Sequence, residues 1–190
     1  MLTVLMIDDD EVVTATIREE AEKQIAGIRF VVETDFDKAD EQITFYRPDI
    51  LILDIYRGLP VSEDVAGQHV WANVWRTRFC PIVVYTAGYE GLDPAVPEAH
   101  PFVRYLEKGE GTDLAVIERI QSFVPTAEAL RSAEAEVERV FQNVLQSVAQ
   151  FAFQHTDDAV LRTEMIVRAA RRRVAAMMDE AICDDKRGIY

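Results

Sequence analysis

Six polar side chains follow short apolar runs in the first part of the chain. They are Asp8, Asp9, Asp10, Asp54, Thr86 and Lys108. Carboxylates that converge in space repel one another unless a cation lies among them. Ligands that offer only oxygen atoms favour Mg²⁺ over zinc. If the fold brings these acids together, the sequence therefore predicts a magnesium site.

Asp54 has the best setting for covalent chemistry, because it follows the apolar residues ILIL, which would hold it rigidly. A carboxylate held in this way can act as a nucleophile toward a phosphoryl group whose charge a metal neutralises. Lys108 would offer a positive charge to the phosphate oxygens, and Thr86 would offer a hydrogen bond. The combination predicts that Asp54 accepts a phosphoryl group.

The apolar runs themselves predict the elements that position these residues. We expect β-strands at 2–7, 29–33, 49–54, 81–85 and 101–106, with a helix between the first two and others at 36–46, 64–78 and 111–124. Runs such as ILIL do not alternate with polar residues, so they suit strands that are buried on both faces. Strand–helix alternation predicts an α/β fold with a doubly wound, five-stranded parallel sheet, whose ligands gather at the carboxyl ends of the strands.

Each of these residues also has an ordinary structural interpretation. An Asp at a strand end is often a helix N-cap, a Thr after a strand is often a turn former, and Lys108-Gly109 suits a surface turn. Taken singly, the structural interpretation is favoured. The occurrence of all of them, in this order, at successive strand ends favours a functional site.

Four segments then resemble the receiver domain of two-component response regulators: MIDDD (6–10), LILDIY (51–56), YTAG (85–88) and YLEKG (105–109). The resemblance spans residues 1–124 and implies the flavodoxin-like receiver fold. It also implies that a histidine kinase or phosphotransfer protein is the phosphodonor. A receiver of this kind is not a conventional enzyme, but it catalyses its own Mg²⁺-dependent phosphorylation and dephosphorylation, here at Asp54.

The resemblance assigns a role to each matching residue. Asp54 is the phosphoacceptor, and Thr86 and Lys108 contact the phosphoryl oxygens. Mg²⁺ is held directly by Asp9, Asp54 and the backbone carbonyl of Tyr56, while Asp8 assists through water. Tyr105 falls at the position of the aromatic switch residue, although a tyrosine packed at a sheet edge is an alternative.

The chain departs from the receiver pattern in three ways, and the first two raise an alternative hypothesis. Gly109 follows Lys108 where receivers usually have Pro, and the segment 55–67 after the phosphoacceptor is long enough for a lid or a partner-binding loop. Residues 88–102 contain three prolines where receivers have their fourth helix, and interior prolines break helices. The alternative is a pseudo-receiver that serves as a docking scaffold without phosphorylation.

The rest of the chain, residues 125–190, predicts a helical hairpin. Pro125-Thr126 has the pattern of a linker and an N-cap, and residues 155–158 suit a turn in which Thr156 caps the second helix. The first helix carries a stripe of apolar residues with an almost unbroken spacing of four and three: Leu130, Val137, Phe141, Val144, Val148 and Phe151. Because two helices alone leave such a stripe exposed, we expect residues 126–183 to form a homodimer or to bind a protein effector.

A basic cluster in this region raises a third hypothesis, a regulator that binds DNA or antiterminator-like RNA. The cluster comprises Arg168, Arg171, Arg172 and Arg173. A solvated helix face is the simpler interpretation, because acidic residues lie nearby and no helix–turn–helix pattern is present. His155, at the predicted turn, is a weak candidate for a second phosphotransfer residue.

Charge and cysteine usage limit the remaining possibilities. Of the net charge of −14, −12 belongs to residues before Pro125, which disfavours docking of that part on DNA or on an anionic membrane. Cys80 and Cys183 form no CxxC pair, so a disulfide scaffold or structural zinc site is not expected. No apolar run is long enough for a signal peptide or a membrane span. We expect a soluble, cytoplasmic protein without a membrane partner.

Overall fold

The computed structural model describes residues 1–58, 66–88, 100–109, 111–155 and 157–187. Its elements, in chain order, are β1 (Leu2–Ile7), α1 (Glu11–Gln24), β2 (Ile28–Glu33), the 3₁₀ helix η1 (Phe36–Lys38), α2 (Ala39–Tyr46), β3 (Ile50–Leu53), α3 (Ala66–Thr77), β4 (Ile82–Thr86), β5 (Val103–Glu107), α4 (Thr112–His155) and α5 (Ala159–Arg187). The chain divides into two compact units, Met1–Leu130 and Arg131–Tyr190, which we call the first and second units. Within the described ranges, no helix combines the length and apolar character that crossing a membrane requires.

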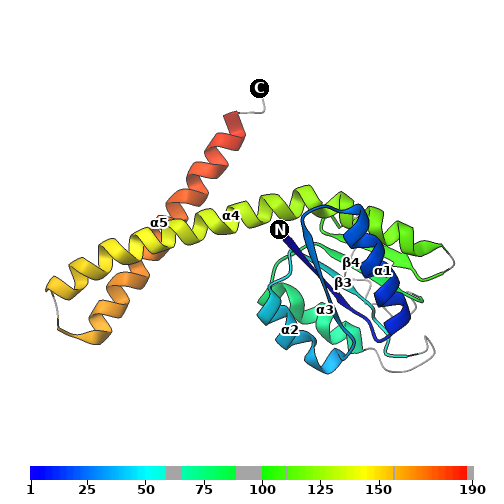
Figure 1. The fold of residues 1–190 in the computed structure, drawn as a ribbon. Helices are drawn as coiled ribbons and strands as arrows, with labels where there is room; N and C mark the ends of the chain where they lie inside the picture. The colour runs from blue at the N-terminus through cyan, green and yellow to red at the C-terminus, as the bar shows by residue number, and fades with distance from the viewer. Residues whose placement is uncertain (59–65, 89–99, 110, 156, 188–190) are drawn as a thin grey trace. The chain divides into compact units, whose positions relative to one another are not determined.

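The first unit is built on a five-stranded sheet with the order β2-β1-β3-β4-β5, in which every neighbouring pair is parallel (Figure 1). This confirms the predicted α/β fold class. Strand β3 is buried along its whole length, as its unbroken apolar run predicts. Strands β1 and β3 end at the same level of the sheet, because Ile7 at the end of β1 pairs with Leu53 at the end of β3.

Helices cover both faces of this sheet, and each face has its own apolar core. Residues of α1 and of the first part of α4 share one core, with Ile17 and Ile120 as examples. Residues of α2 and α3 share the other core, with Ile43 and Val74 as examples. Alternate residues of each strand enter opposite cores, so the sheet is held from both sides and its carboxyl edge is a firm base for a site.

Pro125 lies inside α4, so the prediction of a linker and a new helix start at Pro125-Thr126 is wrong. Phe123 and Ala127, on either side of the proline, are both buried in the core under α1 and α4. Packing on the sheet therefore continues across Pro125. The proline removes one backbone donor, whose usual acceptor is the carbonyl of Gln121, and Gln121 is exposed to water.

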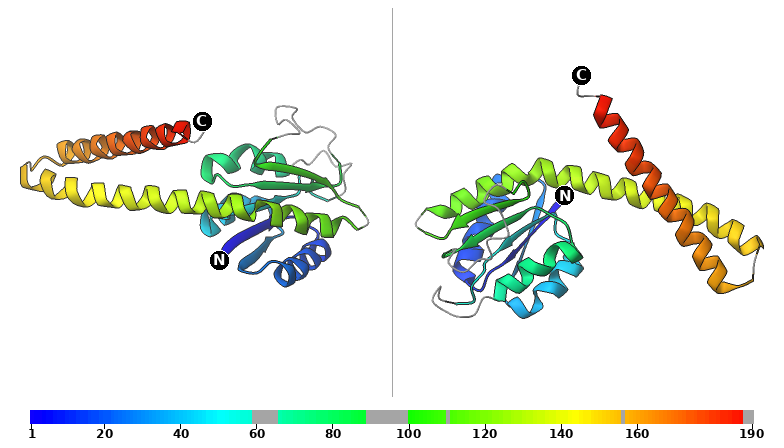
Figure 2. Two further views of the ribbon diagram at one scale, coloured as in Figure 1. Left: turned by 90° about the horizontal axis from the view of Figure 1, so that it is seen from above. Right: turned by 180° about the vertical axis from the view of Figure 1, so that it is seen from behind.

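The second unit is a helical hairpin, in which α5 runs back along the remaining part of α4 (Figure 2). Val140, Ala152 and Ala170 are buried in it. Thr156, expected as the cap of the second helix, lies outside the described residues. The Asp158 carboxylate fills that role, because it accepts hydrogen bonds from the backbone N–H groups of Val160 and Leu161, at 2.8 and 3.1 Å.

Several other expectations involve residues outside the described ranges. They concern most of the segment after the phosphoacceptor candidate (59–65) and most of the proline-containing segment (89–99).

Candidate functional site

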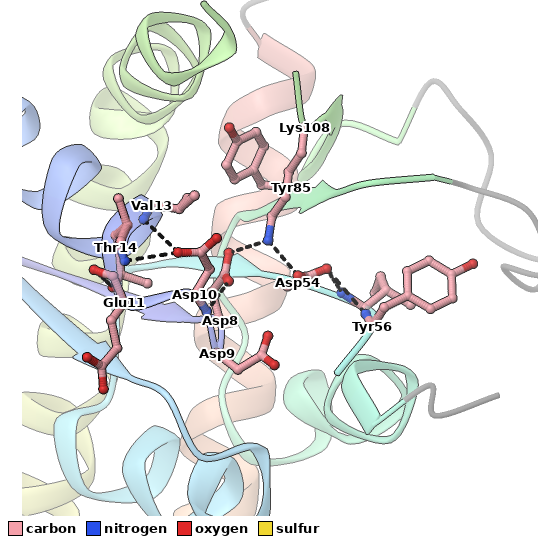
Figure 3. A network of polar contacts seen from close by, with 12 residues as sticks. Asp8, Asp9, Asp10, Glu11, Val13, Thr14, Asp54, Tyr56, Tyr85 and Lys108 are labelled. Atoms are coloured by element: carbon pink, nitrogen blue, oxygen red, sulfur yellow. Dashed lines mark hydrogen bonds and ion pairs between the residues drawn. The ribbon is translucent and has the colours of Figure 1, made fainter. Parts of the chain in front are cut away.

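The carboxyl ends of four neighbouring strands bring the expected residues together at one edge of the sheet (Figure 3). Backbone hydrogen bonds fix their positions. The N–H of Asp54 donates to the carbonyl of Ile7 at 2.9 Å, which places Asp54 beside Asp8, and the N–H of Lys108 donates to the carbonyl of Thr86, also at 2.9 Å. Pairing between strands therefore aligns side chains that are up to a hundred positions apart in the sequence.

Three carboxylates converge at this edge. Asp8, Asp9 and Asp54 each offer an oxygen atom, and these oxygens all lie within 4.8 Å of one another. We call these three residues the acid cluster. Asp8 and Asp54 are buried, whereas Asp9 is more accessible. A cation could therefore approach the buried pair from the side of Asp9.

Lys108 is the cation that the chain itself supplies to the acid cluster. Its Nζ atom lies 2.8 Å from Oδ2 of Asp8 and 2.6 Å from Oδ2 of Asp54, and its side chain is 18% exposed. Burial lowers the pKa of Lys108, but the two carboxylates outweigh this effect and hold the pKa above its ordinary value. The ammonium group is therefore firmly charged.

The single ammonium group does not compensate all the negative charge. Burial raises the pKa of Asp8 from 3.8 to about 6, even though Lys108 acts in the opposite direction. The ammonium group of Lys108, 2.8 Å away, is the one partner that the described residues give to Oδ2 of Asp8, and it is shared with Asp54. The acid cluster thus has unused capacity to bind a cation.

The two oxygens of Asp54 have different surroundings. Oδ1 accepts backbone hydrogen bonds from Ile55 at 2.6 Å and from Tyr56 at 3.2 Å. Oδ2 faces Lys108. The backbone therefore orients the carboxylate so that Oδ2 faces the ammonium group of Lys108.

The three consecutive aspartates, Asp8, Asp9 and Asp10, have different surroundings. Asp8 points into the acid cluster, and Asp9 accepts a hydrogen bond from the backbone N–H of Gly58 at 2.8 Å. Asp10 is instead the N-cap of α1, since its carboxylate accepts from the N–H groups of Val12 and Val13. For Asp10 the structural interpretation of a strand-end acid holds.

Thr86 is fully buried at the end of β4, and its hydroxyl oxygen has no hydrogen-bond partner within the part of the chain described. A buried hydroxyl without a partner is costly in a protein interior, unless a ligand supplies one. The structure therefore leaves the Thr86 hydroxyl available at the edge where the acid cluster lies.

The two aromatic candidates lie away from the carboxylates. The ring of Tyr56 points away from the acid cluster, while its backbone N–H supports Asp54 (Figure 3). Tyr105 packs beside Trp71 of α3, with ring centroids 6.4 Å apart, and burial raises the pKa of its hydroxyl. Tyr105 thus occupies the α3 side of the sheet, three residues before Lys108.

Gly67 is a positioning residue that the sequence interpretation did not single out for this role. It lies in the first turn of α3, and its N–H donates to the carbonyl of Ile55 at 3.0 Å. A Cβ atom at this position would overlap the carbonyl oxygen of Asp54. The close approach of α3 to the backbone of Asp54 therefore requires glycine, and the only sequence signal is a lone Gly near a predicted helix start.

Comparison with solved structures identifies the architecture of the first unit. The N-terminal domain of the nisin resistance regulator NsrR, a lantibiotic response regulator, matches 65% of this chain and 97% of its own at 16% identity and a TM-score of 0.50. The fold is that of a receiver domain. No protein-family model matches the sequence, and no curated protein matches it.

Two further structures have the same receiver fold. The response regulator TrrA from Thermotoga maritima, solved in complex with Mg²⁺ and BeF, matches 65% of this chain and 100% of its own at 17% identity and a TM-score of 0.50. The N-terminal domain of a response regulator/sensory box/GGDEF protein from Carboxydothermus hydrogenoformans matches 70% and 98% at 19% identity, also with a TM-score of 0.50. At these identities the matches establish the receiver fold of this chain, and its chemistry has to be argued from its own residues.

Proposed function

We propose that this chain is a response regulator, whose receiver accepts a phosphoryl group on Asp54 from a histidine kinase or phosphotransfer protein. One observation carries the proposal: the acid cluster and Lys108 meet at the carboxyl edge of a receiver-type sheet, where the Thr86 hydroxyl also lies and has no partner among the described residues. The cluster supplies a nucleophile, and Lys108 and Thr86 supply a positive charge and a donor for the phosphoryl oxygens.

Oδ2 of Asp54 is the proposed attacking atom, because the backbone already engages Oδ1. As Oδ2 bonds to phosphorus, the bond between phosphorus and the donor nitrogen breaks, and the electron pair leaves with that nitrogen. Lys108 would then exchange the carboxylate oxygen, 2.6 Å away, for a phosphoryl oxygen. Thr86 would donate a hydrogen bond from its hydroxyl group to a second phosphoryl oxygen. Both side chains would thereby change partners on phosphorylation.

The acid cluster fits Mg²⁺ by its donor set, since it offers three carboxylates and contains more negative charge than Lys108 compensates. Asp9, Asp54 and the carbonyl of Tyr56 would hold the ion directly, with Asp8 assisting through water. The bound ion would neutralise charge on the phosphoryl oxygens.

Mass spectrometry of the intact chain tests this proposal. Incubation with acetyl phosphate should add one phosphoryl group only when Mg²⁺ is present, and Asp54→Ala should abolish the addition. Asp10→Asn is the matched control, because Asp10 caps α1 and asparagine caps equally well. It should be phosphorylated like the original chain.

The pseudo-receiver is the alternative outcome of the same experiment. Its signature would be a chain that binds Mg²⁺, measured by calorimetry, and whose mass is unchanged by the phosphodonor. The first unit would then be a docking scaffold rather than a phosphoacceptor.

We further propose that the second unit holds the protein as a homodimer. The hairpin leaves large apolar side chains exposed on both of its helices: Val137, Phe141, Phe151, Phe153, Val160, Leu161 and Val167. Apolar surface of this kind on a helical hairpin is efficiently buried by a second hairpin, as in a four-helix bundle. Four residues of the predicted α4 stripe would line the seam. Val137 and Phe141 are exposed, and Val144 and Val148 are half-buried beside Ala169 of α5.

Light scattering of the full chain tests the dimer. Replacing Phe141 and Val148 together by Asp should convert dimer to monomer, because unpaired charges in a buried seam cost several kcal/mol. Phe45→Asp is the matched control, since Phe45 is an exposed aromatic residue on α2 of the first unit. A monomeric original chain, or a double variant that stays dimeric and folded, would contradict the homodimer.

Nucleic-acid binding is the alternative output. Arg168 pairs with Glu164 at 3.1 Å, whereas Arg171, Arg172 and Arg173 are exposed on α5. A steep salt dependence of binding to mixed DNA and RNA, lost on Arg171→Glu with Arg172→Glu, would favour this alternative.

A further inference from the structure

Thr112 contacts Gly109, the residue that follows Lys108, through its side chain and through its backbone N–H, which donates to the Gly109 carbonyl at 3.3 Å. The Thr112 hydroxyl accepts a hydrogen bond from the N–H of Gly109 at 3.0 Å and lies 2.8 Å from the Gly109 carbonyl, to which it can donate. Gly109 has no side chain that could restrain the loop itself. The residue next to Lys108 is therefore held by Thr112, the first residue of α4.

Tyr85 connects this loop to the sheet. Its hydroxyl lies 3.1 Å from the Thr112 hydroxyl and donates to a carboxylate oxygen of Asp113 at 2.9 Å. The side chain is almost fully buried at the end of β4, directly before Thr86. Burial raises the pKa of Tyr85, so its hydroxyl stays protonated and can donate a hydrogen bond. The tyrosine thus binds the first turn of α4 to the strand that carries Thr86.

Tyr85 also contacts Lys108 itself. The Nζ atom lies over the Tyr85 ring, 5.6 Å from its centroid, in the range of a cation–π contact (Figure 3). The long stem of a lysine has many rotamers, so the position of its charge depends on the groups around it. Here the ring of Tyr85 contacts the ammonium group. Because the Tyr85 hydroxyl gives its own proton to Asp113, it bonds to Thr112 by accepting the Thr112 proton, which then does not go to the Gly109 carbonyl. The Thr112 oxygen still accepts from the N–H of Gly109, the next residue after Lys108.

We infer that Tyr85 and Thr112 are positioning residues, which together set the place of the Lys108 ammonium group between Asp8 and Asp54. The effect of these residues on phosphoryl transfer rests on the proposed function. Their role in placing Lys108 does not depend on it. Asp113 also lies in the first turn of α4. A change of partners at Lys108 would therefore alter the contacts of Tyr85 at the start of that helix.

The alternative is that these hydrogen bonds only attach α4 to the sheet. Both roles predict a loss of stability when the hydroxyls are removed, so stability does not separate them. The mobility of Lys108 does, and so does the rate at which Asp54 is phosphorylated at saturating donor.

The first experiment measures Lys108 directly, without phosphorylation. The full chain is treated with an amine-acylating reagent, and the rate of labelling at Lys108 is compared by mass spectrometry with that at the exposed Lys23 of the same molecule. Tyr85→Phe and Thr112→Val should each raise the relative rate about fivefold, the typical effect of one lost hydrogen bond. Thr112→Ser, which keeps the hydroxyl, should restore the original rate.

Gly109 provides a second pair of variants. A Cβ atom at Gly109 would meet nothing closer than the Thr112 methyl group at 3.9 Å, so Gly109→Ala should retain both the loop and the original labelling rate. Gly109→Pro removes the N–H that donates to Thr112, and should raise labelling as Thr112→Val does.

The second experiment measures the rate of Asp54 phosphorylation by acetyl phosphate with Mg²⁺. Tyr85→Phe should lower the maximal rate about fivefold, with little change in the donor concentration at half-maximal rate. Unchanged Lys108 labelling and an unchanged maximal rate in folded Tyr85→Phe would overturn the inference. If the original chain is not phosphorylated at all, the proposed function fails, and the labelling experiment alone decides the role of Tyr85 and Thr112. If Thr112→Val does not fold, Tyr85→Phe and Gly109→Pro decide it.

Discussion

Two buried ion pairs lie at opposite edges of the same sheet, and they are built differently. At the amino edge, Arg78 lies 3.5 Å from Asp49, and both side chains are only 6% exposed. Asp49 also accepts the N–H of Thr3 at 2.7 Å, and Arg78 donates to the carbonyl of Pro48 at 2.9 Å. One arginine faces one aspartate there, and backbone groups add hydrogen bonds to both side chains.

At the carboxyl edge, one ammonium group contacts two of three clustered carboxylates, and the Thr86 hydroxyl has no partner among the described residues. Burial alone therefore does not distinguish a functional site from a structural ion pair, since both are buried. The imbalance of charge and donors does. A balanced pair holds the fold together, whereas an unbalanced cluster needs a ligand to complete it.

The largest effect should come from breaking the balanced pair. Arg78→Ala would leave the Asp49 carboxylate buried without its cation, and should lower the free energy of unfolding by about 3–5 kcal/mol. Urea unfolding measures this. Lys23→Ala, which removes an exposed ion pair on α1, is the control and should leave the free energy of unfolding almost unchanged, because water screens that pair. A loss of similar size in both variants would show that the amino-edge pair does not hold the fold.

The sequence predicted one of these two regions and not the other. Strand β3 could be located from its unbroken apolar run, and parallel pairing then brings Asp8, Asp54 and Lys108 to one edge. The Asp49–Arg78 pair has no such signature, because its partners come from a strand start and a helix end whose approach depends on how α3 packs. The Asp49–Arg78 pair therefore could not be predicted from the sequence, because it depends on the tertiary structure.

Other parts of the site were hidden from the sequence for a similar reason. Tyr85 reads as one more apolar residue of β4, and only the structure brings its hydroxyl to Thr112. Pro125 was a misleading local signal, because burial of its neighbours Phe123 and Ala127 outweighs one lost backbone hydrogen bond. Local rules predicted the elements well, and failed where packing decided.

Removing a charge from the carboxyl edge should raise the free energy of unfolding, whereas removing Arg78 from the amino edge should lower it. The pKa of Asp8 is about 6 in the folded protein against 3.8 ordinarily, so ionised Asp8 lowers stability at pH 7. Asp8→Asn should therefore raise the free energy of unfolding by about 1–2 kcal/mol in metal-free buffer at pH 7. The gain should shrink as the pH falls from 7 to 5, because Asp8 of the original chain then takes up a proton in the folded state.

Urea unfolding with a chelator at both pH values measures the effect of Asp8→Asn. Asp49→Asn is the matched comparison, and it should lose stability, because Asp49 belongs to the balanced pair. Saturating Mg²⁺ should stabilise the original chain more than Asp8→Asn and so remove the advantage of the variant. If both substitutions destabilise the metal-free protein at pH 7, the two edges do not differ in balance.

The smallest effect should come from a pair of buried threonines, one with a partner and one without. The Thr14 hydroxyl donates to the carbonyl of Glu11 at 3.1 Å, whereas the Thr86 hydroxyl has no partner in the described part of the chain. Thr14→Val should cost about 1 kcal/mol, because it removes a formed hydrogen bond. Thr86→Val should leave the free energy of unfolding within about 0.5 kcal/mol of the original value, or raise it, because valine has the same shape and no group that needs a partner. Urea unfolding of the metal-free proteins measures both. A loss of about 1 kcal/mol or more in Thr86→Val would show that its hydroxyl is already bonded in the unphosphorylated protein, and the carboxyl edge would then lack the free donor that distinguishes it from the amino edge.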